Sequence, residues 1–499
     1  MDIKERISTR PLFCSIDVET TMNGTEEVGL SNPMHPLNYI VALGVRKETT
    51  YSPAKNNIWF RDAAHYSTFT AYISDIAQDY TLCGHNFAFD LLYLYRQGPS
   101  IKRDLQSHKI WDTQLAEYIL SGQTMKWSSL DDLCKKYGLP VKDDKIKSYF
   151  IAGIGADKIP MHELEPYLCG DIENTLTIAI RQYDIARDNG QLALIESQME
   201  ALHATVEMRF NGMHVDTDLL DSYTVEVVDD FVKMKLALEA RVAGKIDDIN
   251  SPKQWSEFFF GGTKKVKERV EVGVYKNGNT KYATVVKTVK IAPHVPFKPD
   301  PDKISDKTGQ VSVDDSVLNA MLLDPLVRLS YPTIEIIERL LKYRTISKQL
   351  STYVQGLSNH IIGDKIHGNL NHTATVTGRL SATNPNIQNI SNNPIKKIFT
   401  SRFKGGVIIE PDFNQLEIVA LAHVTRDKQL IHDIEHNTDI HSALYEDMFH
   451  RKPTKEERKP FKSRTFQLIY GAGAKAISKQ AGCSLPEASR YIKEHGIEY

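Results

Sequence analysis

Four carboxylates and a tyrosine in the first third of this 499-residue chain have the types and spacing that phosphodiester hydrolysis requires. Asp17 and Glu19 share one face of a strand-like run, because side chains alternate along a strand. Asp90 follows in a second segment, and Tyr167 and Asp171 are four residues apart, on one face of a helix. Hard oxygen ligands of this kind hold two Mg²⁺ or Mn²⁺ ions roughly 4 Å apart. We therefore predict a two-metal site of the four acids, in which Tyr167 orients the attacking water.

A second group of residues near the C-terminus suits a nucleoside triphosphate. Arg458, Lys462, Phe466 and Tyr470 recur at every fourth residue and form one stripe along a helix. Cations neutralise phosphate charge, and aromatic rings offer a base a stacking platform. The same spacing also fits an exposed helix with two ordinary cations and a core-facing aromatic pair, and the spacing leaves both interpretations open.

A carboxylate, Asp412, lies well upstream of this stripe in the chain. The apolar run Val407–Ile409 predicts a buried strand whose end delivers Asp412 to the start of an amphipathic helix. His432-Asp433 follows, and there we expect an exposed loop acid.

Five ordered blocks resemble the family A DNA polymerases. Residues 412–423 resemble motif A of that family, and residues 458–471 resemble motif B. The remaining blocks are Thr377–Ser381, Pro385–Ile390, and Tyr343-Arg344 with Lys348 and Thr352-Tyr353. The four acids and Tyr167 resemble the proofreading 3′-5′ exonuclease domain of the same enzymes.

The resemblance implies a role for each matching residue of the polymerase half. Asp412 is implied to be one of two palm carboxylates that bind a metal pair, Mg²⁺ or Mn²⁺. Glu417 is implied to crowd the sugar 2′ position, and Phe466 to disfavour chain-terminating dideoxynucleotides. The implied dNTP-binding residues are Glu417, Arg458, Lys462, Phe466 and Tyr470, and the implied DNA-binding residues are Arg379, Gln388 and Asn389.

The fold implied is α/β, with a ribonuclease H-like exonuclease domain followed by the mostly helical thumb and partial palm and fingers of a right-hand polymerase. We expect the exonuclease domain at 1–190 and the thumb at 191–360. The partial palm is expected at 361–435 and the partial fingers at 436–499. Local patterns agree with a helix from about Gln191, a helix capped by Ser251 with Pro252 in its first turn, and a long helix over 333–355.

A lysine-rich segment at about 261–310 interrupts the helical thumb pattern. Its residues alternate on both sides of Asn277-Gly278, which predicts a β-hairpin. One interpretation is a hairpin that grips duplex DNA or docks a processivity factor. The other is an edge hairpin that lysines keep soluble. The sequence favours neither interpretation over the other.

The ending of the sequence suggests an incomplete polymerase site. Family members continue into palm strands with a His-Asp-Glu motif, and none follows motif B here. Since two-metal phosphoryl transfer needs carboxylates that bridge both ions, we expect a truncated chain or a second polypeptide that supplies the C-terminal palm.

Composition is that of a globular protein, with 41% hydrophobic and 25% charged residues and a net charge of −2. Five scattered cysteines, no apolar signal region and no membrane-length apolar run suggest a cytoplasmic protein without a membrane partner. We expect a phage-type replicative polymerase that binds primer-template DNA, single-stranded 3′ ends and dNTPs. Two alternatives are a stand-alone 3′-5′ exonuclease with a DNA-binding remnant and a non-catalytic processivity module.

Overall fold

The computed structural model describes residues 10–49, 55–60, 79–141, 144–275, 279–390, 394–455, 457–458, 461–462, 471–474, 476 and 485–495. The chain divides into two compact units, Met1–Val407 and Ile408–Tyr499. Within the described ranges, no helix has both the length and the apolar character needed to cross a membrane. Four of the five cysteines are free thiols, and Cys483 lies outside the described residues.

The first unit begins with a mixed five-stranded sheet of order β3-β2-β1-β4-β5. Its central strand β1 (Phe13–Thr20) pairs antiparallel with β2 (Ile40–Lys47) and parallel with β4 (Thr81–Gly84). The outer strands are β3 (Asn56–Phe60) and β5 (Ile110–Asp112). β1 is buried along its length apart from Asp17, which is half-buried, so the predicted strand with two acids on one face is confirmed.

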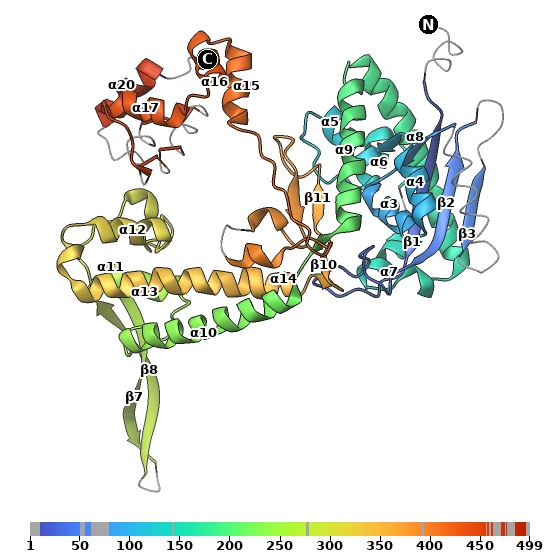
Figure 1. Ribbon diagram of the computed structural model, residues 1–499. Coiled ribbons are helices and arrows are strands. Elements are labelled where there is room, and N and C mark those ends of the chain that lie inside the picture. The colour runs from blue at the N-terminus through green and yellow to red at the C-terminus, as the bar shows by residue number, and fades with distance from the viewer. Residues whose placement is uncertain are drawn as a thin grey trace. The chain divides into compact units, whose positions relative to one another are not determined.

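Some of the helices that follow contact the strands of this sheet directly, and the others pack on those helices (Figure 1). They are α3 (Ala88–Tyr95), α4 (Pro99–Gln106), α5 (Thr113–Leu120), α6 (Leu130–Tyr137), α7 (Asp144–Ile151), α8 (Met161–Asp188) and α9 (Leu192–Asn211). Gly44 on β2 lets α8 approach closely, because a Cβ there would lie 2.9 Å from a Leu168 side-chain carbon. Leu202 and Val206 of α9 are buried with Phe210 packed beside them, and the predicted helix from about Gln191 is confirmed.

The middle of the first unit is helical, as predicted. It comprises α10 (Thr217–Arg241), α11 (Pro252–Phe260), α12 (Asp315–Leu323) and α13 (Tyr331–Lys348), which continues as a π-helical turn, η4 (Gln349–Gln355). The Ser251 side chain accepts a hydrogen bond from the Gln254 backbone N–H, so the predicted cap is confirmed. α10 and α13 pack side by side around a core that includes Trp255 (Figure 1).

A two-stranded antiparallel hairpin, β7 (Gly262–Val274) and β8 (Thr280–Ile291), extends from α11 (Figure 1). The predicted hairpin is therefore confirmed, while its Asn277-Gly278 turn lies outside the described residues. Short strands complete the unit: β6 (Met213–His214), β9 (Ile361–Ile362), β10 (Lys365–Ile366), β11 (Asn369–Asn371) and β12 (Ser381–Thr383).

The second unit contains α15 (Leu416–Thr425), α16 (Lys428–Glu435), α17 (Ile440–Phe449) and α20 (Leu485–His495). Tyr445 and Phe461 are buried there with their rings edge-on to each other, and the exposed Phe449 ring contacts both.

Two local predictions for the region around Asp412 are wrong. Val407–Ile409 form no strand, and these three side chains are 50–81% exposed. A strand is stabilised by hydrogen bonds to a neighbouring strand, and in the described part of the chain no segment pairs with this one. Asp433 lies on α16 rather than in a loop, and its carboxylate accepts a hydrogen bond from Gln429.

Candidate active sites

Three of the predicted metal ligands meet beside the central strand β1. β1 presents Asp17 and Glu19 on the same face, and α8, packed across β1 and β2, brings Asp171 to them. Ligand oxygens of Asp17, Glu19 and Asp171 all lie within 4.8 Å of one another. Glu19 and Asp171 are buried. Residues more than 150 positions apart thus form one acidic cluster.

The fourth acid, Asp90, lies in the first turn of α3 and is buried against β1. Its Oδ1 accepts a hydrogen bond of 2.9 Å from the Val18 backbone N–H. Burial raises the pKa of Asp90 well above its usual value, and the nearby charge of Asp17 raises it further. Asp90 therefore binds the backbone of β1 between the two acids Asp17 and Glu19.

The acidic cluster fits a divalent cation. Crowded carboxylates in a poorly solvated place repel one another, and a bound cation offsets that repulsion. The donors are all carboxylate oxygens, the ligand type that Mg²⁺ and Mn²⁺ prefer. Asp17, Glu19, Asp90 and Asp171 would hold the metal, which would supply activation of water and stabilisation of a leaving oxygen.

Tyr167 lies one helical turn before Asp171 on α8. Its ring packs edge-on against Phe150, with ring centroids 6.1 Å apart. The ring is part-exposed, which leaves it accessible to a substrate.

Asp112, by contrast, has a structural role. It caps α5, and its two carboxylate oxygens accept backbone N–H groups from four residues, Asn86, Phe87, Gln114 and Leu115. These bonds join the start of α5 to the turn that leads into α3 and Asp90. Burial raises the pKa of Asp112 to about 6, against the opposing effect of those bonds.

The residues predicted to bind DNA in the first unit are exposed. Arg379 accepts a hydrogen bond from Thr375 at its carbonyl, and Gln388 and Asn389 form a short 3₁₀ turn. The Tyr353 hydroxyl donates to the Asn389 carbonyl and anchors that turn to η4.

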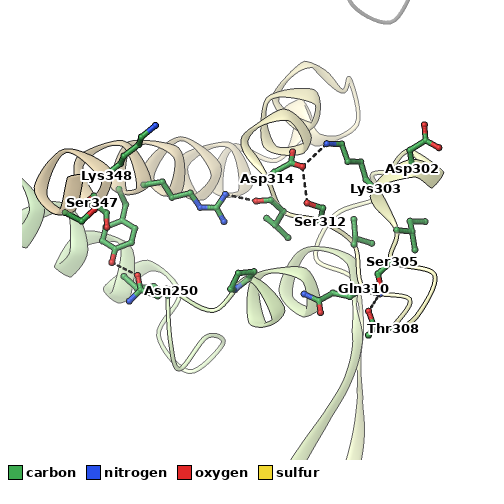
Figure 2. Close-up of a pocket in the computed structure, with 18 residues that line it drawn as sticks. Asn250, Asp302, Lys303, Ser305, Thr308, Gln310, Ser312, Asp314, Ser347 and Lys348 are labelled. Carbon is green, nitrogen blue, oxygen red and sulfur yellow. Dashed lines mark hydrogen bonds and ion pairs between the residues drawn. The ribbon is translucent and has the colours of Figure 1, made fainter. Parts of the chain in front are cut away.

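A groove of about 1010 Å³ lies along α13 in the same unit (Figure 2). Arg344, Ser347 and Lys348 line its α13 side. The Tyr343 hydroxyl donates to Asn250 Oδ1 at 2.8 Å, and Arg344 donates to the Val313 carbonyl at 2.6 Å. Three residues of one polymerase-like block, Tyr343, Arg344 and Lys348, thus line one polar groove.

In the second unit, Asp412 is exposed on an irregular segment, and Glu417 lies in the first turn of α15. Arg458 donates to Asp439 through Nε at 2.5 Å and Nη2 at 2.9 Å, and this pairing lowers the pKa of Asp439 to about 2. Lys462 is exposed. Phe466 and Tyr470 lie outside the described residues.

His441 is a candidate that the sequence reasoning missed. It is buried on α17, and the charges of Lys462 and Arg458 act on it, which places it beside the predicted phosphate-binding cations. Burial lowers the pKa of His441, so its imidazole stays neutral to a lower pH than that of an ordinary histidine. The sequence feature that could have pointed to it is Asp439-Ile440-His441, an acid and a histidine at the start of a helix.

Comparison with known proteins shows which family this chain resembles. The family model described as DNA polymerase family A matches residues 218–499, more than half of the chain. DNA polymerase I of Bacillus subtilis is 27% identical over 398 residues, which cover 77% of this chain and 40% of that protein. DNA polymerase I of Streptococcus pneumoniae is 29% identical over 406 residues, which cover 78% of this chain and 40% of that protein.

The chain therefore spans about 40% of the length of these relatives. Among solved structures, it shares its fold with the POL domain of Pol1 from M. smegmatis in complex with DNA primer-template and dNTP, at a TM-score of 0.67 and 18% identity. That match covers 99% of this chain and 73% of the other. With the family match over more than half of its length, this chain belongs to DNA polymerase family A.

Proposed function

We propose that residues 1–190 form a ribonuclease H-like 3′-5′ exonuclease that proofreads DNA ends. The observation that carries this proposal is the cluster of Asp17, Glu19 and Asp171 oxygens within 4.8 Å, with Asp90 buried beside it. The chain's own residues would bind Mg²⁺ or Mn²⁺ and orient the attacking water through the Tyr167 hydroxyl. The metal would lower the barrier by activating that water and steadying the departing 3′ oxygen.

We further propose that residues 361–499 contribute palm and fingers elements of a template-directed DNA polymerase. Support comes from the family match over 218–499 and from the M. smegmatis Pol1 domain, which was solved with primer-template DNA and dNTP. Asp412 would be a metal ligand, and Glu417 would crowd the sugar 2′ position. Arg458 and Lys462 would contact the triphosphate beside Phe466 and Tyr470. Arg458 would then leave its ion pair with Asp439 and bind phosphate instead.

Primer-template DNA would contact the first unit at Arg379, Gln388 and Asn389 and along the α13 groove. Arg344 and Lys348 offer positive charge in that groove, and Ser347 and Ser351 offer hydroxyl donors (Figure 2). Phosphate contacts of this type position a duplex without reading its sequence.

The lysine-rich hairpin, β7–β8, would hold the duplex backbone and so raise processivity. Lys267, Arg269 and Lys290 are exposed and share one face of the hairpin by strand register. That face is complementary in charge to phosphate.

A primer-template assay tests the two activities together. An end-labelled primer on a longer template is incubated with the chain and Mg²⁺, with and without the four dNTPs. The exonuclease proposal expects shortening without dNTPs and its loss in Asp17→Ala/Glu19→Ala, and nuclease activity that survives this double change would refute the metal assignment. The polymerase proposal expects lengthening with dNTPs. Shortening alone, under both conditions, would favour a stand-alone exonuclease.

A further inference from the structure

A surface turn at residues 375–379 carries Arg379, which is proposed above to contact primer-template DNA. The turn belongs to no helix or strand, and Val376 within it is 62% exposed. Inside the turn, the Thr375 hydroxyl donates to the Arg379 carbonyl at 2.8 Å and closes it. Because an exposed turn of this length buries little of its own surface, contacts from outside must hold it in one position.

Tyr118 of α5 supplies such a contact. Its side chain is 3% exposed, and its hydroxyl donates to the Thr375 carbonyl at 2.6 Å across 257 positions of the chain. Thr375 is thus bonded on one side to Arg379 and on the other to Tyr118. The hydroxyl of a buried tyrosine therefore holds the turn at the residue that closes it.

The end of α5 contacts the turn at a second point. The Gln123 backbone N–H donates to the Tyr118 carbonyl at 2.8 Å, which folds the residues after α5 back onto the helix. The Gln123 side chain lies beside Gly378, since a Cβ added there would be 3.4 Å from Gln123 Nε2. Two contacts from one helix end thus fix the turn at two of its residues.

α5 is a rigid base for these contacts. Its first turn is capped by Asp112, whose carboxylate accepts four backbone N–H groups, and the helix packs against α8 and α9. A side chain locked by packing on a helix fixes its partner more precisely than one on a loop. The Tyr118 bond therefore specifies one position of the turn.

The segment after the turn leads to the other residues proposed to bind DNA. Gln388 Nε2 donates to the Leu380 carbonyl at 3.3 Å. A displacement of the turn would therefore reach Gln388 as well as Arg379.

We propose that Tyr118 is a positioning residue for primer-template DNA. Without touching the DNA, its hydroxyl holds the turn so that Arg379 meets the primer. The proposal rests on the proposed DNA contact of Arg379. It adds that residues 1–190, through α5, set how firmly the primer is held.

Limited proteolysis tests the anchor without DNA. Trypsin cleaves after Arg379 when the turn opens, and mass spectrometry follows the rate in the native chain. Tyr118→Phe removes the hydroxyl alone and should speed this cleavage by roughly two- to tenfold, the range that one buried hydrogen bond provides. Tyr93→Phe is the matched control, because it removes a buried hydroxyl that donates to the Ser31 carbonyl in a different loop. Parent-like cleavage of Tyr118→Phe would overturn the proposal.

A double-mutant cycle tests whether the anchor acts through Arg379. Dissociation constants for a labelled primer-template duplex are measured by fluorescence anisotropy in EDTA for the parent, Tyr118→Phe, Arg379→Ala and the double variant. We expect Tyr118→Phe to weaken binding by roughly two- to tenfold in the parent and to have no further effect once Arg379 is absent. A structural role elsewhere would weaken binding equally in both backgrounds, which would contradict positioning of Arg379.

Thr375→Val provides a second variant outside the buried interior. It removes the hydroxyl that closes the turn at nearly constant volume and should reproduce both effects of Tyr118→Phe. The unfolding midpoint of Tyr118→Phe should equal that of Tyr93→Phe. A midpoint well below that control would assign Tyr118 a general structural role and count against the proposal.

The two tests separate failure of this inference from failure of the proposed function. An Arg379→Ala chain that binds DNA as the parent does would refute the DNA contact of Arg379 and with it the positioning role, even if Tyr118→Phe speeds cleavage. An Arg379→Ala chain that binds weakly, beside a Tyr118→Phe chain that binds like the parent, would leave the DNA contact intact and overturn only the role of Tyr118.

Discussion

Crowded carboxylates dominate the first unit at the scale of single residues. Asp17, Glu19 and Asp171 place like charges within 4.8 Å, and the pKa of Asp90 is raised well above its usual value. Such an arrangement lowers the stability of a metal-free fold and is maintained where a cation binds.

Asp17→Asn should stabilise the metal-free chain and abolish most of the stabilisation by metal. Removing one of three repelling charges is expected to raise the unfolding midpoint in EDTA by about 2–4 °C, the shift that ~1 kcal/mol produces in a domain of this size. Mg²⁺ should raise the midpoint of the parent more than that of the variant. Differential scanning calorimetry with and without Mg²⁺ measures both, and equal Mg²⁺ shifts would refute metal binding at Asp17.

Asp112→Asn should destabilise the fold through the backbone. The amide nitrogen of asparagine would face the Phe87 N–H, which Asp112 Oδ2 now accepts at 2.9 Å, so one buried donor loses its acceptor. We expect a loss of about 1–3 kcal/mol in urea unfolding. Asp132→Asn at the exposed start of α6 is the control and should lose less than ~1 kcal/mol. A similar loss in both variants would contradict the special role of Asp112.

At the scale of elements, each helix or strand presents its functional residues by its own periodicity. β1 alternates Asp17 and Glu19 onto one face, and α8 spaces Tyr167 and Asp171 by one turn. The hairpin follows the same rule, since cross-strand register divides its cations between two faces.

The two faces of the hairpin permit a matched test of DNA binding. Lys267, Arg269 and Lys290 changed together to Gln should reduce the salt dependence of duplex binding by up to about 2.7 in slope and shorten the products made per binding event. The opposite-face pair Lys281→Gln/Lys287→Gln should have little effect. Binding that neither set changes would leave the lysines as solubilising residues, and equal effects from both faces would exclude a specific docking face.

At the scale of the whole molecule, the two compact units are built on separate interiors. The hydrophobic clusters of the first unit are drawn from residues 13–399, and the buried aromatic residues described in the second include Tyr445 and Phe461. Each unit therefore carries its own stabilising contacts.

A chain that ends at Val407 should consequently remain folded. We expect its main unfolding midpoint to stay within about 3 °C of that of the parent, because its buried clusters are complete. It should still shorten a primer, while any dNTP-dependent lengthening should disappear with Asp412. Calorimetry and the primer assay check the two parts separately. A midpoint that falls by much more would show that residues 408–499 stabilise the first unit.

The sequence by itself determined what depends on neighbours along the chain. Alternation predicted β1 and the hairpin, and helical spacing with local caps predicted α9, α11 and α13, because these patterns express backbone hydrogen bonding within a few residues. Family motifs in the sequence indicated the polymerase family, which the match over residues 218–499 established.

Only the tertiary structure decided what depends on distant segments. Asp171 reaches Asp17 across more than 150 residues because α8 packs on β1. Asp112 carries no signal of its capping role beyond its own helix, and its bonds to the Asn86 and Phe87 N–H groups depend on how the segment before α3 packs. Val407–Ile409 looked like a strand locally yet forms none. Pairing, burial and the neutralisation of charge are set by the surrounding chain, and a local pattern contains no record of them.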